Sequence, residues 1–445
     1  MPIDVSVIVP VYNPGAYIHP LLDCLDRQSI GGDRLEAIFV DDGSTDETPA
    51  LLDAWAATRP NVTVIHQANH GWPGQPRNAG IQIARGRYIQ FVDQDDWLGD
   101  TALAELVAFA DTNQSDVIVG KMVGINRTVP KALFRKTVPR VVIGRDPIQD
   151  SQTPHKMFRR AFLDEIGLRF PEGKRRLEDH VFVTNAYLQA KVVSVYADTD
   201  CYFHISRPDG GNAGYRAYDP VAYYRAVDEV LDIIDRHLPD AAVRDAYAVR
   251  WLRTELIGRL HERQIRALPR ARRHAFFDEI SRVVRTRYTP RGIGVATRPI
   301  RIGAFVTRHA TAREWDRFAR AIADITVAAA RDDGIRVYLR GRELPRDAGM
   351  SVLLRRTVPR VADAVLADLG DDIALVPDGA DRDVKPGTTL TVKLAVGDRS
   401  CTVAATPPGR RDRLVRRGRG LVGVARHRAS QVLRRARSWR AARRR

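Results

Sequence analysis

The stretch LEAIFVDDGSTD, residues 35–46, joins a short apolar run to a cluster of acids and turn residues. A similar run, VSVIVPV at residues 5–11, precedes it, and a helical stripe that carries Leu21, Leu22 and Leu25 lies between the two. Apolar runs of this length that end in turn residues are typical of parallel strands buried on both faces. The stretch and its neighbours therefore predict a strand–helix–strand unit in a parallel sheet.

The alternation of strands and helices continues to about residue 110. Further strands are expected at residues 62–65 and 88–92, with a helix from about residue 77 to 85 between them and another helix after residue 100. This order predicts an α/β fold with a doubly wound sheet that helices cover on both faces. Ligands bind sheets of this kind at the carboxyl ends of the strands.

Two groups of acids occupy these predicted strand ends. Asp41 and Asp42 follow the second strand, and Asp93, Asp95 and Asp96 follow the fourth. Neighbouring carboxylates repel one another unless a cation or hydrogen-bond donors satisfy them, and Mg²⁺ and Mn²⁺ prefer such oxygen ligands. The alternative is that these acids only cap helices or face solvent. Because two groups occur at neighbouring strand ends, we favour a binding site.

The remainder of the chain changes character twice. From residue 221 to about 285 the apolar spacing predicts helices, and a poorly patterned connector follows near residues 290–299. Short apolar runs separated by turn residues then predict a small β-sandwich, with strands at 335–339, 351–354, 373–376 and 390–396. The predicted organisation is a catalytic domain at 1–220, a helical linker at 221–290, a β-rich domain at 300–406 and a tail at 410–445.

The positive charge is concentrated in this tail. The formal net charge is +17, and residues 410–445 contribute +14 through 15 arginines and one acid, Asp412. The rest of the chain, at 17 − 14 = +3, is nearly neutral, so we expect no specific nucleic acid partner. On a helix, Leu421, Ala425 and Trp439 would share one face, which predicts a basic amphipathic tail that lies on an anionic membrane surface. The alternative is a disordered tail that binds polyanions through its charge alone.

The cysteines and the hydropathy bear on the compartment. Cys24, Cys201 and Cys401 lie far apart without metal-type spacing, which favours a reducing cytoplasm. No run of 18 apolar residues occurs, so no membrane-spanning segment is expected. The run at residues 5–11 has no basic stretch before it and is interpreted as a strand, not as a signal peptide.

Four ordered motifs resemble glycosyltransferase family 2. They are VIVPVYN at residues 7–13, VDDGSTD at 40–46, NHG at 69–71 with RNAG at 77–80, and DQDD at 93–96. The resemblance extends from residue 1 to about 215. It implies a GT-A fold that binds a nucleotide-sugar.

Part of this region is most similar to a narrower group, the bacterial wall teichoic acid glycosyltransferases, which decorate polyol-phosphate polymers. The similarity lies in residues 177–179, Leu-Glu-Asp, and in residues 202–212. A β-sandwich that follows helices is also similar to one branch of that group, in which such domains mediate oligomerisation. The resemblance therefore implies a homo-oligomer formed through the β-rich domain.

The resemblance also implies roles for single residues. Contacts with the nucleotide-sugar would come from Pro10, Tyr12, Asp41, Asn69, Arg77, Asp93 and Arg207. Asp95 would hold Mn²⁺ or Mg²⁺ at the diphosphate, and His204, after a predicted strand, is a further candidate metal ligand or else a structural histidine. Asp179 would be the catalytic base, with Glu178 supporting acceptor or sugar binding, and the alternative for Asp179 is a helix cap.

The predicted function is inverting, metal-dependent transfer of a hexosyl or N-acetylhexosaminyl group from a UDP-sugar to a hydroxyl of a cell-envelope polymer such as a polyol-phosphate teichoic acid. The enzyme would be cytoplasmic and peripheral at the inner face of the cell membrane. One alternative is a glycosyltransferase acting on lipid-linked or capsular polysaccharide, and another is a non-catalytic binder of anionic polymer. Asp179 argues against the binder, since a binder needs no base. A dinucleotide-dependent dehydrogenase is disfavoured because no Gly-x-Gly-x-x-Gly motif follows the first strand.

Overall fold

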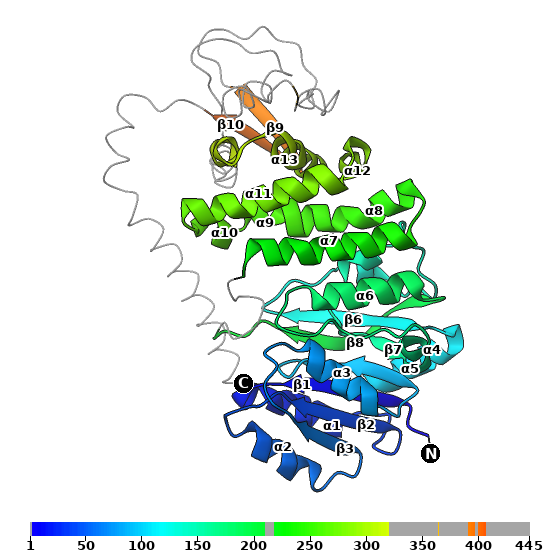
Figure 1. Cartoon of the computed structure of the whole chain (residues 1–445). Coiled ribbons are helices and arrows are strands. Elements are labelled where there is room, and N and C mark those ends of the chain that lie inside the picture. The colour runs from blue at the N-terminus through cyan, green and yellow to red at the C-terminus, as the bar shows by residue number, and fades with distance from the viewer. Residues whose placement is uncertain (1, 210–217, 320–363, 365–389, 397–398, 406–445) are drawn as a thin grey trace, which may run out of the picture. The chain divides into compact units, whose positions relative to one another are not determined.

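The computed structural model describes residues 2–209, 218–319, 364, 390–396 and 399–405 (Figure 1). It has two compact units, residues 1–312 and 313–445. The first unit contains an eight-stranded sheet followed by a group of helices. Within the described residues, no helix combines the length and the apolar character that crossing a membrane requires.

The sheet has the strand order β3-β2-β1-β4-β7-β6-β8-β5. Strands β1 to β4 run parallel, β7 runs antiparallel to both β4 and β6, and β8 runs parallel to β6. The strands are β1 Val5–Val11, β2 Leu35–Asp41, β3 Val62–His66, β4 Tyr88–Phe91, β5 Trp97–Leu98, β6 Val117–Ile125, β7 Met157–Arg159 and β8 Val193–Ile205. The strands predicted up to residue 92 are therefore present, with ends that differ by at most one residue.

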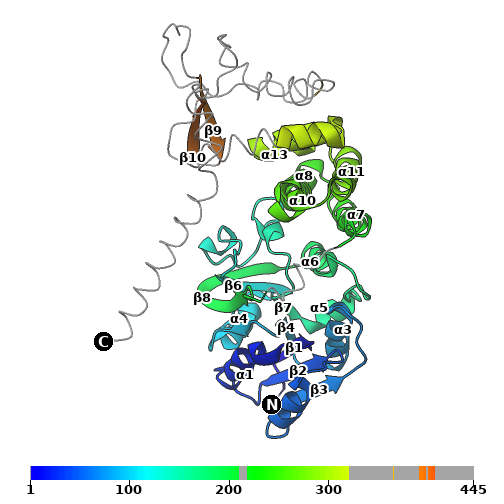
Figure 2. The same ribbon diagram turned by 90° about the vertical axis from the view of Figure 1, so that its left-hand side faces the viewer.

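Helices cover both faces of the sheet, as predicted: α1 and α4 lie on one side of the strands, and α3 and α5 lie on the other (Figure 2). All residues of β1 and β2 are buried, which explains their largely apolar character, and the buried polar residues Ser6 and Glu36 hydrogen-bond to each other at 2.5 Å. Helix α3 packs closely on β1, and Gly80 permits this because it has no side chain. A Cβ at Gly80 would collide with Ile8. The helices of this part are α1 His19–Asp26, α2 Thr48–Ala56, α3 Gly74–Ile83, α4 Ala102–Asn113, α5 Arg160–Glu165 and α6 Glu178–Gln189.

The helices expected from residue 221 onward are also present. They are α7 Pro220–His237, α8 Ala241–Trp251, the π-helix η5 Leu252–Ile257, α9 Gly258–His261, α10 Arg263–Ala267 and α11 Arg270–Arg287. Helix α7 packs on α6, so the helical group adjoins the sheet part through α6 (Figure 1).

The poorly patterned connector is helical in the structure. Helices α12 Pro290–Gly294 and α13 Arg298–His309 occupy it, so the segment from residue 300 to 309, predicted as the start of a β-rich domain, is not β-structure. A proline stands in the first turn of each helix, where its missing N–H costs no hydrogen bond. Ile302, Phe305 and Val306 are buried at helical spacing.

The described part of the second unit contains two strands of the region predicted as a β-rich domain. The strand predicted at residues 390–396 is present as β9 Leu390–Val396, which pairs antiparallel with β10 Arg399–Ala405. The strands predicted at 335–339, 351–354 and 373–376 and the tail at 410–445 lie outside the described residues. The β-sandwich and the amphipathic tail therefore stay predictions.

Candidate active site

The candidate site lies at the carboxyl ends of β1, β2 and β4. Strand β1 has β2 on one side and β4 on the other, so the chain order reverses there and opens the crevice in which α/β sheets bind ligands. Gln94 ties two of these strand ends together. Its Oε1 accepts from the backbone N–H of Tyr12 at 2.7 Å, and its Nε2 donates to the Tyr12 carbonyl at 3.1 Å.

The two acids after β2 hold neighbouring loops in place. Asp41 accepts from the Ser44 backbone at 2.9 Å and lies 2.9 Å from Nδ1 of His66. Asp42 accepts from the backbone N–H groups of His70 and Gly71 at 3.0 and 3.2 Å. Both carboxylates are buried, so they organise the crevice wall whether or not a ligand is bound.

The loop that carries Asn69 packs against the turn after β2. Gly43 has φ +74°, and a Cβ there would lie 3.0 Å from the backbone nitrogen of Asn69. Asn69 itself is exposed, as is Tyr12 with 41% of its surface accessible. Pro10 is buried in β1. The structure thus brings these predicted nucleotide contacts to one edge of the sheet, and their roles stay predictions.

Arg207 also lies at this edge of the sheet. Its guanidinium stacks over the Tyr17 ring at 4.1 Å and pairs with Asp209 at 2.7 Å. It also interacts with Asp95, because its positive charge opposes the rise in the pKa of that carboxyl. Burial and the neighbouring Asp93 raise the pKa of Asp95 to about 6, so a cation near this carboxylate would be favoured.

A buried arginine connects the nucleotide crevice with the predicted catalytic acids. Arg77 donates to Asp93 at 2.8 Å and to Glu178 at 3.4 Å, and its side chain is only 4% exposed. Burial tends to lower the pKa of this guanidinium, but the two carboxylates outweigh it and raise the pKa. Desolvation tends to raise the pKa of Asp93, but its contacts with His155 and Arg77 outweigh this and hold the pKa well below the usual range.

The structure gathers a possible cation site from three buried residues. Ligand atoms of Asp96, His155 and His204 all lie within 4.8 Å of one another. Burial lowers the pKa of His155 and is the main cause that lowers the pKa of His204 to about 2, which favours the neutral imidazoles that can ligate a metal. Asp95, the other predicted metal ligand, is not a member of this group of three.

His155 supports a ligand at this position. Its Nε2 pairs with Asp93 Oδ2 at 2.9 Å, and its Nδ1 has no hydrogen-bond partner. The ring is almost fully buried and stacks on Tyr202. Nε2 also lies 4.0 Å from Asp96 Oδ2, so this nitrogen faces both carboxylates and can ligate a cation beside them.

Glu178 and Asp179 are the first two residues of α6. Leu177 occupies the cap position with φ +62°, a left-handed conformation that is strained for leucine. Asp179 therefore is not the cap residue, although it accepts from the N–H of His180 at 2.9 Å. Burial raises the pKa of Asp179, the neighbouring Glu178 adds to the rise, and Lys156 interacts with Asp179 electrostatically from a buried position.

Trp72 holds Glu178 from the other side. Its indole N–H donates to Glu178 at 2.6 Å, and Arg176 stacks over the indole at 5.4 Å. Burial raises the pKa of Glu178, and the charge of Arg77 and the bond from Trp72 oppose that rise. Trp72 lies in the loop after β3, so this bond links the nucleotide side of the site with α6.

The helical group supports the same helix. His180, next to Asp179, lies 3.5 Å from Nη1 of Arg250, which pairs with the buried Glu255 at 2.7 Å. His180 also packs edge-on against Trp251. The two acids at the start of α6 are therefore held partly by residues of α8 and the π-helix.

The sequence analysis assigns no role to three residues that the structure brings into this site: Trp72, Asp96 and His155. Asp96 belongs to the predicted acid cluster but was not singled out from it. His155 stands in an irregular stretch, Thr153-Pro154-His155, that shows no motif. Trp72 is an aromatic residue inside a loop motif, which is the one signal that could have marked it.

Comparison with known proteins agrees with this geometry. Residues 6–171 match the model of glycosyl transferase family 2, and residues 220–319 match that of the glycosyl transferase TarS linker domain. The chain is thus similar to glycosyltransferase family 2 over residues 6–171, where the predicted motifs lie.

Two curated relatives and one solved structure are particularly similar. A poly(ribitol-phosphate) β-glucosyltransferase of Bacillus spizizenii is 40% identical over 232 residues, which cover 52% of this chain and 36% of the relative. The poly(ribitol-phosphate) β-N-acetylglucosaminyltransferase TarS of Staphylococcus aureus is 34% identical over 244 residues, covering 54% and 42%. A crystal structure of residues 1–349 of S. aureus TarS with UDP-GlcNAc has a TM-score of 0.63 at 28% identity, covering 69% of this chain and 87% of that one. The match thus spans less than half the length of these two curated relatives.

Proposed function

We propose that this protein transfers a sugar, with inversion, from a UDP-sugar to a hydroxyl of a polyol-phosphate polymer of the cell envelope. The observation that carries the proposal is the chain of contacts from Asp93 through Arg77 to Glu178, with Asp179 beside it. These contacts support the proposal that Asp179 acts as a base at the edge of the crevice. The relatives that act on poly(ribitol-phosphate) and the structure that holds UDP-GlcNAc support the substrate classes.

In this mechanism Asp179 accepts the proton of the attacking hydroxyl. A carboxyl whose pKa burial has raised is a stronger base than an exposed aspartate, which suits general base catalysis. Glu178, fixed by Arg77 and Trp72, would orient the acceptor or the sugar. Arg207, beside Asp95, would stabilise the negative charge of the departing UDP.

A divalent cation fits the donors that the structure provides. Asp96, His155 and His204, or Asp95 with His204, would hold it, and its charge would neutralise the diphosphate when bound. Imidazole nitrogens suit transition metals better than Mg²⁺, so the histidines favour Mn²⁺ of the two ions expected.

Binding of UDP and Mn²⁺ should raise the melting temperature. At ligand concentrations 100 times the dissociation constant the stabilisation should approach about 2.7 kcal/mol. His204→Ala should remove the metal-dependent share, and comparison of Asp95→Asn with His155→Ala will show which donor set is used. An unchanged melting temperature with saturating UDP and Mn²⁺ would contradict the nucleotide assignment.

Three finer statements extend the proposal. The acceptor would be an anionic polymer, the β-rich domain would form a homo-oligomer, and the tail would bind the inner face of the cell membrane. The tail carries 14 of the 17 net positive charges, which supports the attraction to anionic lipid.

Removal of residues 410–445 should abolish most binding to anionic vesicles while leaving UDP-sugar affinity unchanged. The attraction should also weaken with salt, since the Debye length falls from about 30 Å at 0.01 M to about 10 Å at 0.1 M. Co-sedimentation with vesicles measures the first effect and donor titration the second. Equal sedimentation of the full chain and the truncated chain would refute the membrane role.

A further inference from the structure

The segment after β6 is unusually basic. Residues 127–145 contain no acid and include a run of cations that we call the basic strip: Arg127, Lys131, Arg135, Lys136 and Arg140. All five side chains are exposed. In the part of the chain that the structure describes, none of them forms an ion pair with a carboxylate, whereas the next basic residue, Arg145, pairs with Asp146.

One end of the basic strip adjoins the active site. The chain reverses at Asn126, with φ +54°, so that the carbonyl of Arg127 approaches Gly124 too closely to leave room for a side chain there. Gly124 pairs with His204 on β8, and the charge of Arg127 acts on both Asp95 and His204. The strip therefore begins beside the residues assigned to the diphosphate.

From there the strip follows the sheet away from the site. Val138 bridges Val195 on β8 in antiparallel register, and the N–H of Val141 donates to Val193 at 2.8 Å. Val193, the partner of Val141, also pairs with Val117 at the start of β6, so the far end of the strip lies level with residue 117 of β6 and its near end level with residue 124. From residue 117 to residue 124 there are seven steps of about 3.3 Å, so the strip extends over roughly 23 Å along the sheet.

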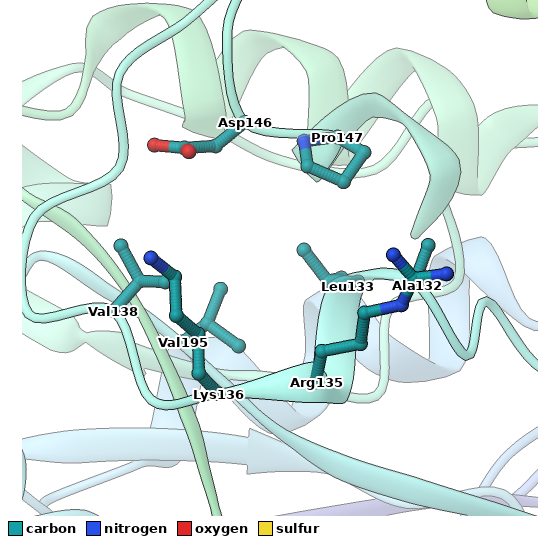
Figure 3. Close-up of a pocket in the computed structure, with 8 residues that line it drawn as sticks. All are labelled: Ala132, Leu133, Arg135, Lys136, Val138, Asp146, Pro147 and Val195. Atoms are coloured by element: carbon teal, nitrogen blue, oxygen red, sulfur yellow. The ribbon is translucent and has the colours of Figure 1, made fainter.

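The middle of the strip borders a small cavity of about 240 Å³. Figure 3 shows the side chains of Arg135 and Lys136 on one side of this cavity and those of Asp146 and Pro147 on the other. Leu133, Val138 and Val195 also line it. The cavity is slightly smaller than a typical drug-sized pocket of about 300 Å³, so it suits one small repeat unit, not a large ligand.

We propose that the basic strip binds the anionic acceptor polymer several repeat units away from the reacting hydroxyl. The inference rests on the proposed function and locates its acceptor. In the described part of the chain no ion pair neutralises these exposed cations, and phosphate groups are anions that arginine and lysine bind well. A phosphodiester polymer carries one such group in every repeat, so a single chain leaving the active site can meet several cations in succession.

The test removes charge from the part of the strip that is remote from the catalytic residues. In Lys131→Gln/Arg135→Gln/Lys136→Gln, KM for poly(ribitol phosphate) should rise roughly tenfold, since each exposed charge contributes modestly and three act together. The value of kcat, KM for the UDP-sugar and the rate with a single-unit acceptor should stay unchanged. The difference from the parent protein should shrink at 1 M salt, where the Debye length is about 3 Å.

The matched control removes three exposed arginines from the helical group, as Arg225→Gln/Arg236→Gln/Arg285→Gln. It should leave KM for the polymer unchanged although it lowers the net charge equally. An unchanged KM in the strip variant, or an equal rise in the control, would overturn the proposed role of the strip alone. If the parent protein transfers sugar to no polyol-phosphate acceptor, the proposed function fails, and the inference fails with it.

Discussion

Replacing Asp179 by asparagine is expected to reduce turnover by about 10²–10⁴-fold while leaving UDP-sugar binding nearly unchanged. The amide has the size of the carboxyl and keeps its contact with the N–H of His180, but it cannot accept the proton of the acceptor hydroxyl. Steady-state rates and donor titration of the same preparation measure the two effects separately. Asp164→Asn, at an exposed position on α5, is the matched control and should retain full activity.

The pH dependence of turnover is a second test of Asp179 as the catalytic base. Because burial raises the pKa of Asp179 above its ordinary value, the basic form is lost as the pH falls through this raised pKa. The acid limb of the kcat profile should therefore lie above pH 4, the region of an ordinary aspartate with a pKa of about 3.9, and should vanish in Asp179→Asn. If the variant keeps near-full turnover, Asp179 must be reassigned to a structural role at the start of α6.

Substituting Arg77 with methionine should destabilise the protein by about 3 kcal/mol, because it removes the cation that the buried Glu178 shares with the Asp93 side chain, which is 33% exposed. Asp93 would keep its contact with His155, and Glu178 its bond from Trp72, but the cation between the two acids would be gone. Chemical denaturation without nucleotide measures the loss. The UDP-sugar affinity should fall as well, since Asp93 would no longer be held in place.

A second variant separates the ion network from simple loss of packing. In Arg77→Met/Glu178→Gln one of the stranded charges is gone, so this double variant should be more stable than Arg77→Met alone. Arg77→Met with parental stability would show that these contacts do not contribute, and so would a double variant with no recovery.

The strands that form the crevice could be predicted from the sequence because their signals are local. A buried parallel strand is mostly apolar, and the acids that follow it mark its end, as in residues 35–46, where Glu36 is the one charged residue before Asp41. The structure therefore has both acid clusters at the edge of the sheet where the sequence predicts them. The short connector helices from residue 290 were missed because prolines near their starts resemble the ends of helices as much as their beginnings.

The contacts that complete the site could not be predicted, because they join residues far apart in the chain. His155 approaches Asp93 and His204 only after β7 has entered the sheet between β4 and β6. The bond between Trp72 and Glu178 spans more than 100 residues. The sequence around His155 and Trp72 has no periodic pattern that distinguishes these two residues from ordinary core or surface residues.

The contact between His180 and Arg250 limits how this protein can be recombined. Residues 1–312 form one compact unit, and the start of α6 depends on side chains from α8 and the π-helix. A chimaera with its crossover near residue 218 would separate these partners, whereas one with its crossover near residue 312 would inherit them together. The sheet and its helical group should therefore be transferred together, up to residue 319, where the match to the linker domain ends.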